Sequence, residues 1–171
     1  MYMNIKSVIL TSFALALSFV SNAQKTVVDI AVGSPAHTTL VAAVKAAGLV
    51  ETLQGAGPFT VFAPTNDAFA KLPEGTLTSL LKPESKATLV KILTYHVVSG
   101  NLDAAAVIAA IKAGKGSVKV TTVSGGILTA SMKNGKVILT DEKGNVSTVV
   151  ATDLKAGNGV VHVIDAVVLP K

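Results

Sequence analysis

The sequence of 171 residues contains no cysteine, no arginine and no tryptophan, and each absence excludes a class of function. Without cysteine, the chain can form neither a disulfide framework nor a thiolate metal site. All 15 basic residues are lysine, so the bidentate arginine contacts that read DNA bases are unavailable. Aromatic residues, 4% of the chain, are too few for a platform on which bases stack. We therefore expect no nucleic-acid partner, and a fold that is stabilised by packing.

The first 23 residues are typical of a secretory signal peptide. Lys6 precedes an apolar run over residues 8–20, and Ala23 ends an A-x-A-like cleavage site. Serine and threonine residues shorten this run below the roughly 20 apolar residues that a membrane-spanning helix needs. We therefore predict that the mature chain, residues 24–171, has no transmembrane segment and is exported to an extracellular or periplasmic location.

The mature chain has the length of one ordinary domain, enough to bury a core. Its formal charge is basic, +5 for the full chain, and its lysines are scattered along the sequence rather than clustered. Scattered lysines are typical of a solvated surface. We find no internal repeat or low-complexity linker, so the sequence predicts a single domain.

Helical periodicity dominates the first half of the chain, and two-residue periodicity dominates the second half. The expected helices lie at residues 34–54, 65–72, 76–81, 83–93 and 101–113. The expected strands lie at residues 59–63, 95–98, 118–123, 127–132, 136–140, 146–151 and 160–169. This order predicts an α+β fold, in which a largely antiparallel sheet system has helices gathered beside it.

The stretch GPFTVFAPTNDAF, residues 57–69, changes from strand to helix at Pro64. One interpretation is a loop that presents Asp67 as a reactive carboxylate, but the neighbouring sequence supplies no second carboxylate or histidine as a partner. The other is a buried strand followed by a helix whose first N–H groups are capped by threonine or asparagine oxygens. We favour the capped helix, because an aspartate there suits the positive helix end. The residues that then specify the fold are Phe62, Pro64, Thr65, Asn66, Asp67 and Phe69.

Two later segments extend this pattern. LTYHVVSG stands at residues 93–100, and NGVVHVIDAVVLP stands at residues 158–170. Together with GPFTVFAPTNDAFAKLP at residues 57–73, they resemble the three signature segments of the fasciclin domain (FAS1) family in order and separation. The resemblance covers about residues 25–171, so we interpret residues 24–171 as one fasciclin-like domain.

The resemblance implies a twisted β-sandwich or wedge flanked by a cluster of helices. It also implies an extracellular or cell-surface module used in adhesion and matrix contacts, without catalytic activity or cofactor. In this family the Tyr-His region is linked to partner binding, which makes Tyr95 and His96 the candidate partner-binding residues here. We find none of the family's short acidic integrin peptides, and a small exported single-domain form is typical of bacteria, so we do not extend integrin binding to this chain.

The polar residues of the later segments have structural interpretations of their own. Tyr95 and His96 are expected on opposite faces of a short strand, so at least one points inward, and we favour a structural role over partner binding. His162 and Asp165 are expected on opposite faces of an apolar strand, where they specify the fold. A zinc site would need His37 to converge with the other two histidines, and no closely spaced pair supports it, so we predict no metal site.

Two functions remain open at this point. The first is an exported, non-enzymatic adhesion module that contacts a cell-surface or matrix protein or polysaccharide. The second is a carrier or sensor of a small apolar ligand held between the helices and the sheet, since the abundant Ala, Val and Leu could line a pocket. A hydrolytic enzyme is a remote third, because the chain has no Gly-x-Ser-x-Gly elbow and no phosphate-binding glycine loop.

Overall fold

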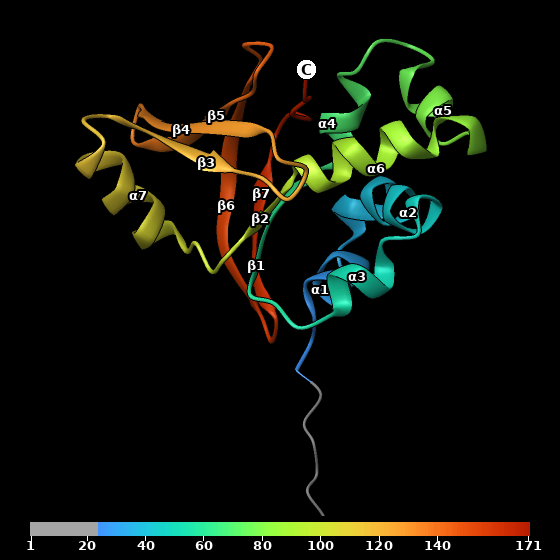
Figure 1. Cartoon of the computed structure of the whole chain (residues 1–171), viewed down its shortest axis with the longest axis horizontal. Helices are drawn as coiled ribbons and strands as arrows, with labels where there is room; N and C mark the ends of the chain where they lie inside the picture. The colour runs from blue at the N-terminus through green and yellow to red at the C-terminus, as the bar shows by residue number, and fades with distance from the viewer. Residues whose placement is uncertain (1–23) are drawn as a thin grey trace, which may run out of the picture.

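The computed structural model describes residues 24–171, which form helices and one seven-stranded sheet (Figure 1). The predicted signal peptide, residues 1–23, lies outside the described residues. The helices are α1 (Val27–Val32), η1 (Pro35–His37), α2 (Thr38–Ala47), α3 (Val50–Gln54), α4 (Asn66–Ala70), α5 (Thr76–Leu80), η2 (Pro83–Ser85), α6 (Lys86–Tyr95) and α7 (Ala104–Ala113). The strands are β1 (Phe59–Pro64), β2 (Val97–Ser99), β3 (Ser117–Thr121), β4 (Ile127–Lys133), β5 (Lys136–Thr140), β6 (Val146–Ala156) and β7 (Gly159–Ile164).

The sheet is mixed and nearly closes on itself. Its strand order is β2-β1-β7-β6-β5-β4-β3, and every neighbouring pair is antiparallel except β1 and β7. The two edge strands approach each other at an isolated bridge between Val98 and Thr122. Next to it, the Val123 N–H donates to the Val97 carbonyl at 2.8 Å. The expected α+β class is confirmed, and the largely antiparallel sheet contains one parallel pair, β1 and β7, next to its edge strand β2.

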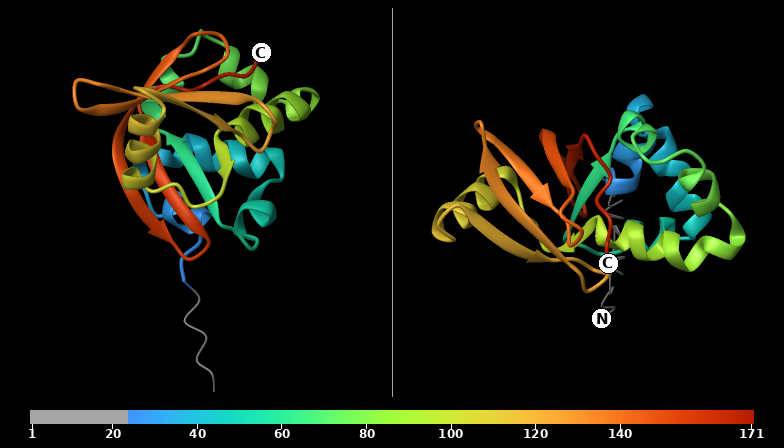
Figure 2. Two further views of the ribbon diagram at one scale, coloured as in Figure 1. Left: turned by 60° about the vertical axis from the view of Figure 1, so that its left-hand side comes forward. Right: turned by 90° about the horizontal axis from the view of Figure 1, so that it is seen from above.

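Two cores lie on opposite faces of strands β1, β2 and β7. Helices α1–α6 gather on one side of β1, β2 and β7, whereas α7 and strands β3–β5 lie on the other side (Figures 1 and 2). In β1, Val61 and Ala63 contribute to the core on the helical side, and Phe62 contributes to the core inside the curved sheet. We call these the helical core and the barrel core. A strand between two cores must be apolar on both faces, which explains the sequence pattern of β1.

Local signals explain several element ends. Thr65, the N-cap of α4, accepts a hydrogen bond from the Ala68 N–H, as the sequence of the first signature segment predicted. Asp103 caps α7 in the same way through the Ala106 N–H. The sequence analysis made no prediction for α1, whose Thr26 and Asp29 form a reciprocal capping box. That pair, three residues apart, is the signal that could have revealed this helix.

Several expected strands differ at their ends from those observed; β6, for example, continues to Ala156 instead of ending at residue 151. Tyr95 ends α6 and His96 follows as its C-cap, so the strand predicted at residues 95–98 is wrong for its first two residues. The Tyr-His-Val-Val sequence favours a strand by composition, but the backbone of α6 continues through it because Leu89, Ile92 and Leu93 keep one face buried in the helical core. At the other end of the chain, β7 stops at Ile164 instead of continuing to residue 169.

Candidate functional site

The first signature segment joins the central sheet to the helical side. Asn66 lies at the start of α4, where its side-chain Oδ1 accepts from the Thr39 N–H at 3.0 Å and its Nδ2 donates to the Pro35 carbonyl at 3.0 Å. These bonds satisfy a free N–H group in the first turn of α2. Asp67 is exposed in the first turn of α4. The polar groups of this segment therefore cap and connect helices, and no second carboxylate faces Asp67 to form a catalytic pair among the interactions of the described residues.

The apolar members of this segment are buried at the same junction. Phe62 is 3% exposed, and its ring stacks on the His162 ring with a centroid distance of 5.7 Å. Phe69 is buried in the helical core, and Pro64 is the last residue of β1, where it pairs with Ile164. Each of these three residues lies where the sequence analysis expected a core or strand-end position.

Tyr95 and His96 are both buried, which differs from the expectation that they point to opposite faces of a strand. Their exposed fractions are 0% and 2%. The Tyr95 hydroxyl donates to the Ile127 carbonyl at 2.7 Å and accepts from the Glu142 N–H at 3.2 Å. Burial raises the pKa of Tyr95 to about 12. This phenol therefore connects the end of α6 to the start of β4 and to the β5–β6 turn.

The hydrogen bonds of His96 identify its tautomer. Nδ1 lies 2.8 Å from the Ile92 carbonyl, which can only accept, so Nδ1 carries the proton. Nε2 then accepts from the Val168 N–H at 3.2 Å. Burial disfavours the charged ring and lowers the pKa of His96 to about 4. The neutral ring joins α6 to the C-terminal segment, and direct partner binding by Tyr95 or His96 stays a prediction that their burial does not favour.

The closing segment places His162 and Asp165 at different points of the sheet. His162 is buried on β7, and its Nε2 donates to the Leu102 carbonyl at 2.7 Å. Asp165 follows β7 rather than lying within it, and its carboxylate accepts from the Thr148 N–H of β6 at 2.7 Å. The two side chains do not pair with each other. Both bond backbone groups of other segments, and their role in specifying the fold stays a prediction.

Sequence reasoning missed three further polar side chains that hydrogen-bond to backbone groups of distant segments. Asn158 donates to the Leu53 and Gly55 carbonyls at 2.8 and 3.0 Å, and accepts from the Val27 N–H at 2.9 Å. Buried Thr60 donates to the Gly100 carbonyl, and buried Asp141 accepts from the Leu169 N–H. These residues were missed because Asn158-Gly159 indicates a turn, Thr60 suits a strand and Asp141 suits a loop, and none of those signals reveals a distant partner. Together with the signature residues, they hold the two halves of the domain together.

The histidines do not converge. His37 lies in η1, where its Nδ1 is 2.8 Å from the Ser34 hydroxyl, while His96 and His162 are held by the contacts given above. Within residues 24–171, no group of three or more His, Asp or Glu side chains could hold a metal ion. His96 and His162 bond backbone groups, whereas the Nε2 of His37 is buried and has no hydrogen-bond partner among the described residues.

A cavity lies between the helices and the sheet. It has a volume of about 210 Å³ and is lined mainly by apolar side chains of α1, α2, α3, β1, α6 and β2. Val61, Leu93 and Val97 contribute to its inner wall. Val32, which is 57% exposed, contributes on the solvent side, so the cavity reaches the surface beside α1. An engineered apolar cavity of about 150 Å³ binds benzene, so this space is large enough for a small apolar molecule.

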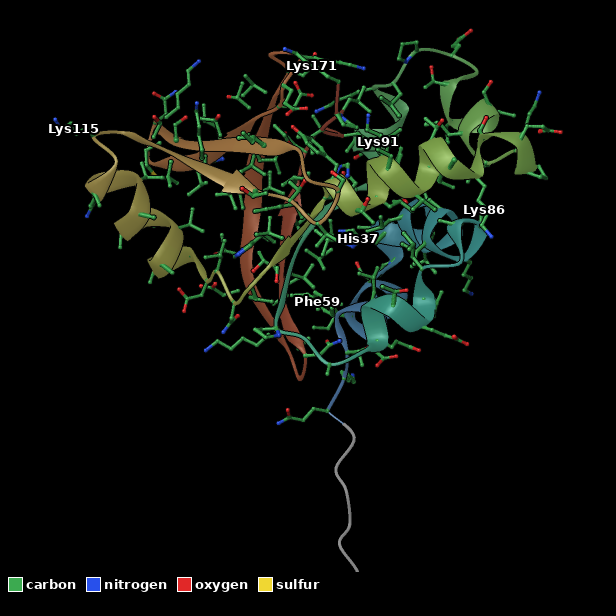
Figure 3. The ribbon with its side chains drawn as sticks, in the orientation of Figure 1. His37, Phe59, Lys86, Lys91, Lys115 and Lys171 are labelled. Atoms are coloured by element: carbon green, nitrogen blue, oxygen red, sulfur yellow. The ribbon has the colours of Figure 1, made fainter. Side chains whose placement is uncertain are left out.

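A second feature lies at the opposite end of the molecule. Between Asp103 and Asp141 the chain carries five lysines and no acidic residue, and all five are exposed. The loop after α7 leads into β3, whose Ser117 pairs with Ser131 just before the β4–β5 hairpin. Figure 3 shows Lys115 at the far end of the molecule from the helical core. We call this surface the lysine-rich end; its residues are Lys112, Lys115, Lys119, Lys133 and Lys136.

The lysine-rich end corrects one expectation from the sequence. The lysines are separated along the chain, but the antiparallel pairing of β3, β4 and β5 brings two short segments of the chain to the same end of the sheet. Lys133 and Lys136 pair directly across the hairpin, although like charges in that position repel. Residues 104–140 contain no acidic residue, so this segment carries charge of one sign.

The nearly closed seven-stranded sheet, the helices on one side of it and the internally bonded signature residues define an α+β module. A family model described as Fasciclin domain matches residues 35–170. The chain belongs to the fasciclin domain family.

Relatives and a solved structure agree with this assignment. Protein sll1483 of Synechocystis is 55% identical over 145 residues, which are 85% of this chain and 73% of that protein. Transforming growth factor-beta-induced protein ig-h3 of Sus scrofa is 39% identical over 150 residues, which are 85% of this chain but 19% of that protein. Immunogenic protein MPT70 of Mycobacterium tuberculosis is 37% identical over 142 residues, 80% of this chain and 65% of that protein. None of these names describes an enzyme.

The fold comparison is with a FAS1 domain pair from the insect cell adhesion molecule Fasciclin I. The TM-score is 0.75 at 18% identity, and the match covers 85% of this chain and 51% of that chain. At this identity the likeness shows the fold. Within the described residues, no helix is both long and apolar enough to cross a membrane.

Proposed function

We propose that this chain is an exported, non-enzymatic binding module of the adhesion type, and that it contacts an acidic polysaccharide of the cell surface or matrix. The lysine-rich end is the observation that carries the proposal. Exposed charges of one sign on a rigid end attract and orient an oppositely charged polymer. The signature residues support the same view, because apart from Asp67 their polar groups are used inside the fold and leave recognition to the exterior.

The chemistry of this surface favours a polysaccharide over a nucleic acid. Lysine is a flexible point charge that suits carboxylates spaced along a sugar chain, whereas base reading depends on arginine forks and stacked aromatic rings. The chain has no arginine, and the residues of the lysine-rich end include no aromatic side chain. Binding should therefore weaken steeply as salt screens the charges.

Protein expressed from the full-length sequence tests this proposal by binding to an immobilised polyuronate, with neutral dextran as the reference. We expect binding to the polyuronate alone, and loss of binding at high salt. Changing Lys112, Lys115, Lys133 and Lys136 to Gln should weaken binding by about tenfold, or about 0.3 kcal/mol for each exposed charge. The matched control changes Lys25, Lys82, Lys86 and Lys155 to Gln. Equal losses in both variants would contradict a localised contact surface.

The proposal includes export of the protein from the cytoplasm, which a separate experiment tests. Cell fractionation after expression of the full-length sequence should recover the protein in the periplasm or medium, with an N-terminus at residue 24. A protein that stays in the cytoplasm with residues 1–23 attached would contradict the proposed location.

We infer a second candidate function, a carrier or sensor of a small apolar ligand, because the cavity of about 210 Å³ is apolar and reaches the surface. Native mass spectrometry of the purified protein should then show a bound small molecule or a stoichiometric complex with an added one. Val41→Phe, which enlarges a side chain that lines the cavity, should abolish that complex. A complex that survives this change would place the ligand elsewhere.

A further inference from the structure

The two ends of the cavity differ in polarity, and this difference restricts the ligand. The inner wall offers a ligand no hydrogen bond, because both ring nitrogens of His96, a polar residue that lines the cavity, are already bonded to Ile92 and Val168. Placing a polar group there without a partner would cost free energy. The part of a ligand that reaches the inner wall must therefore be apolar.

Polar side chains line the cavity on its exposed side. Asp29, Lys45 and Gln54 contribute to the lining, and all three are exposed. The Asp29 carboxylate is held in the helix cap through one oxygen, since its Oδ2 accepts from the Thr26 N–H and the Thr26 hydroxyl, both at 2.8 Å. Those two bonds lower the pKa of Asp29 and keep it ionised within the capping box of α1. Lys45 is the one cation among the residues that line the cavity, and it donates no hydrogen bond to residues 24–171.

We propose that the cavity binds one small amphiphile, with a compact apolar body against the inner wall and an anionic group at the opening beside Lys45. This inference rests on the second proposed function and names its ligand class. The volume of about 210 Å³ admits a short or branched aliphatic chain or a small ring system, and it excludes complete burial of a long extended chain. Val32, which lines the cavity and is 57% exposed, can cover the part of the apolar body that lies outside the inner wall.

Three small probes test the proposal: octanoate, octanol and octylammonium. They have the same number of carbon atoms and differ in the charge of their polar group. Each is titrated into protein expressed from the full-length sequence, by calorimetry and by NMR of the α1–α3 amides. Octanoate should bind more tightly than octanol by about fivefold, the size of one partly exposed ion pair. Octylammonium should bind most weakly. Lys45→Gln should bring octanoate to the affinity of octanol without changing the affinity for octanol.

Two variants test the location and keep the result interpretable if one fails to fold. Val41→Phe and Ala31→Leu both enlarge side chains that line the cavity, and each should abolish the binding of octanoate and octanol. Ala42→Leu, on the exposed face of α2, is the matched control and should bind as the unchanged protein does.

The outcomes separate this inference from the function on which it rests. Suppose that octanol binds, that the variants abolish its binding, and that all three probes bind with equal affinity. The carrier function then stands, and the proposed anionic group of the ligand is wrong. If no probe gives saturable binding, both are wrong. If binding survives both cavity variants, the ligand lies elsewhere and the proposal is overturned.

Discussion

The two cores of this domain differ in how completely they are filled. The helical core contains a cavity of about 210 Å³, whereas a hollow at the edge of the barrel core, beside Phe62 and Val149, measures about 10 Å³. The smaller space is at the lower limit for a single water molecule. Six short helices packed beside a sheet leave space because their ends and crossings are irregular, whereas antiparallel strands bring side chains into regular layers. The larger of these two spaces therefore lies on the helical side of the sheet.

The largest expected effect is a loss of stability at low pH, and it comes from His96, the buried residue that joins α6 to the C-terminal segment. Its pKa is about 4 in the folded protein, because burial disfavours the charged ring, and about 6.5 in an unfolded chain. Below pH 6.5 the unfolded chain therefore takes up a proton that the folded protein does not. Stability is complete above about pH 6.5 and should fall by about 3 kcal/mol as the pH decreases to about 4.

Urea unfolding at pH 7, 5.5 and 4 measures this loss. The variant His96→Gln should be less stable at pH 7 and should show a flatter profile. His37→Gln is the comparison, because burial also lowers the pKa of His37 and adds a change of the same sign. A profile that His96→Gln leaves unchanged would assign the pH dependence to other groups.

The second prediction compares the same substitution in both cores. Ala130 is 1% exposed in the barrel core, and Ala31 lines the cavity. Ala130→Leu should lower the free energy of unfolding by about 2 kcal/mol, because a filled core cannot accept more volume without strain. Ala31→Leu should leave it unchanged or raise it slightly, because the added atoms enter empty space. Thermal and urea unfolding of the two variants measure the difference, and equal destabilisation would mean that the two cores are equally filled.

The third prediction concerns Tyr95, whose hydroxyl is bonded in the barrel core. Tyr95→Phe keeps the ring but leaves the Ile127 carbonyl and the Glu142 N–H without this partner. The expected loss is about 1.5 kcal/mol, as for other buried groups that lose a hydrogen bond. Tyr95 is the one tyrosine in residues 24–171, so the substitution removes the one phenol hydroxyl of that part of the chain. Binding of the polyuronate should not change, and a folded Tyr95→Phe variant that loses binding would assign a recognition role to this residue.

The smallest effects are expected at the entrance of α4. Thr65→Ala removes a cap bond to the Ala68 N–H and should cost about 1 kcal/mol. Asp67→Ala removes only a favourable charge in the first turn and should cost about 0.5 kcal/mol. Urea unfolding of both variants measures the two losses in the free energy of unfolding and shows which is larger. A larger loss for Asp67→Ala would show an interaction of this carboxylate beyond the helix end.

The sequence predicted features that depend on neighbouring residues. The change from strand to capped helix at Pro64 was predicted because Thr65 and Asn66 combine a turn signal with an N-cap signal. The structural role of His162 followed from its place in an apolar segment. In contrast, Tyr95 and His96 were assigned to a strand, since β-branched residues follow them and the packing of α6 that extends the helix is tertiary.

Features that depend on distant contacts were not predictable in the same way. The bonds from Asn158 to the ends of α1 and α3 join residues about 100 positions apart. The cavity depends on how six segments pack, and the sequence supplied only the apolar residues that could line it. The lysine-rich end required the register of three strands, without which its five lysines look scattered.

The central claim is that the polar side chains of the signature segments are used within the fold, and that recognition takes place on the exterior. The most direct test is an NMR titration of the His96 ring nitrogens, with and without saturating polyuronate. We predict a neutral ring with the proton on Nδ1 from pH 7 down to about pH 5, in spectra that the polymer does not alter. A ring that titrates near pH 6.5, or whose signals shift when the polymer binds, would contradict the claim.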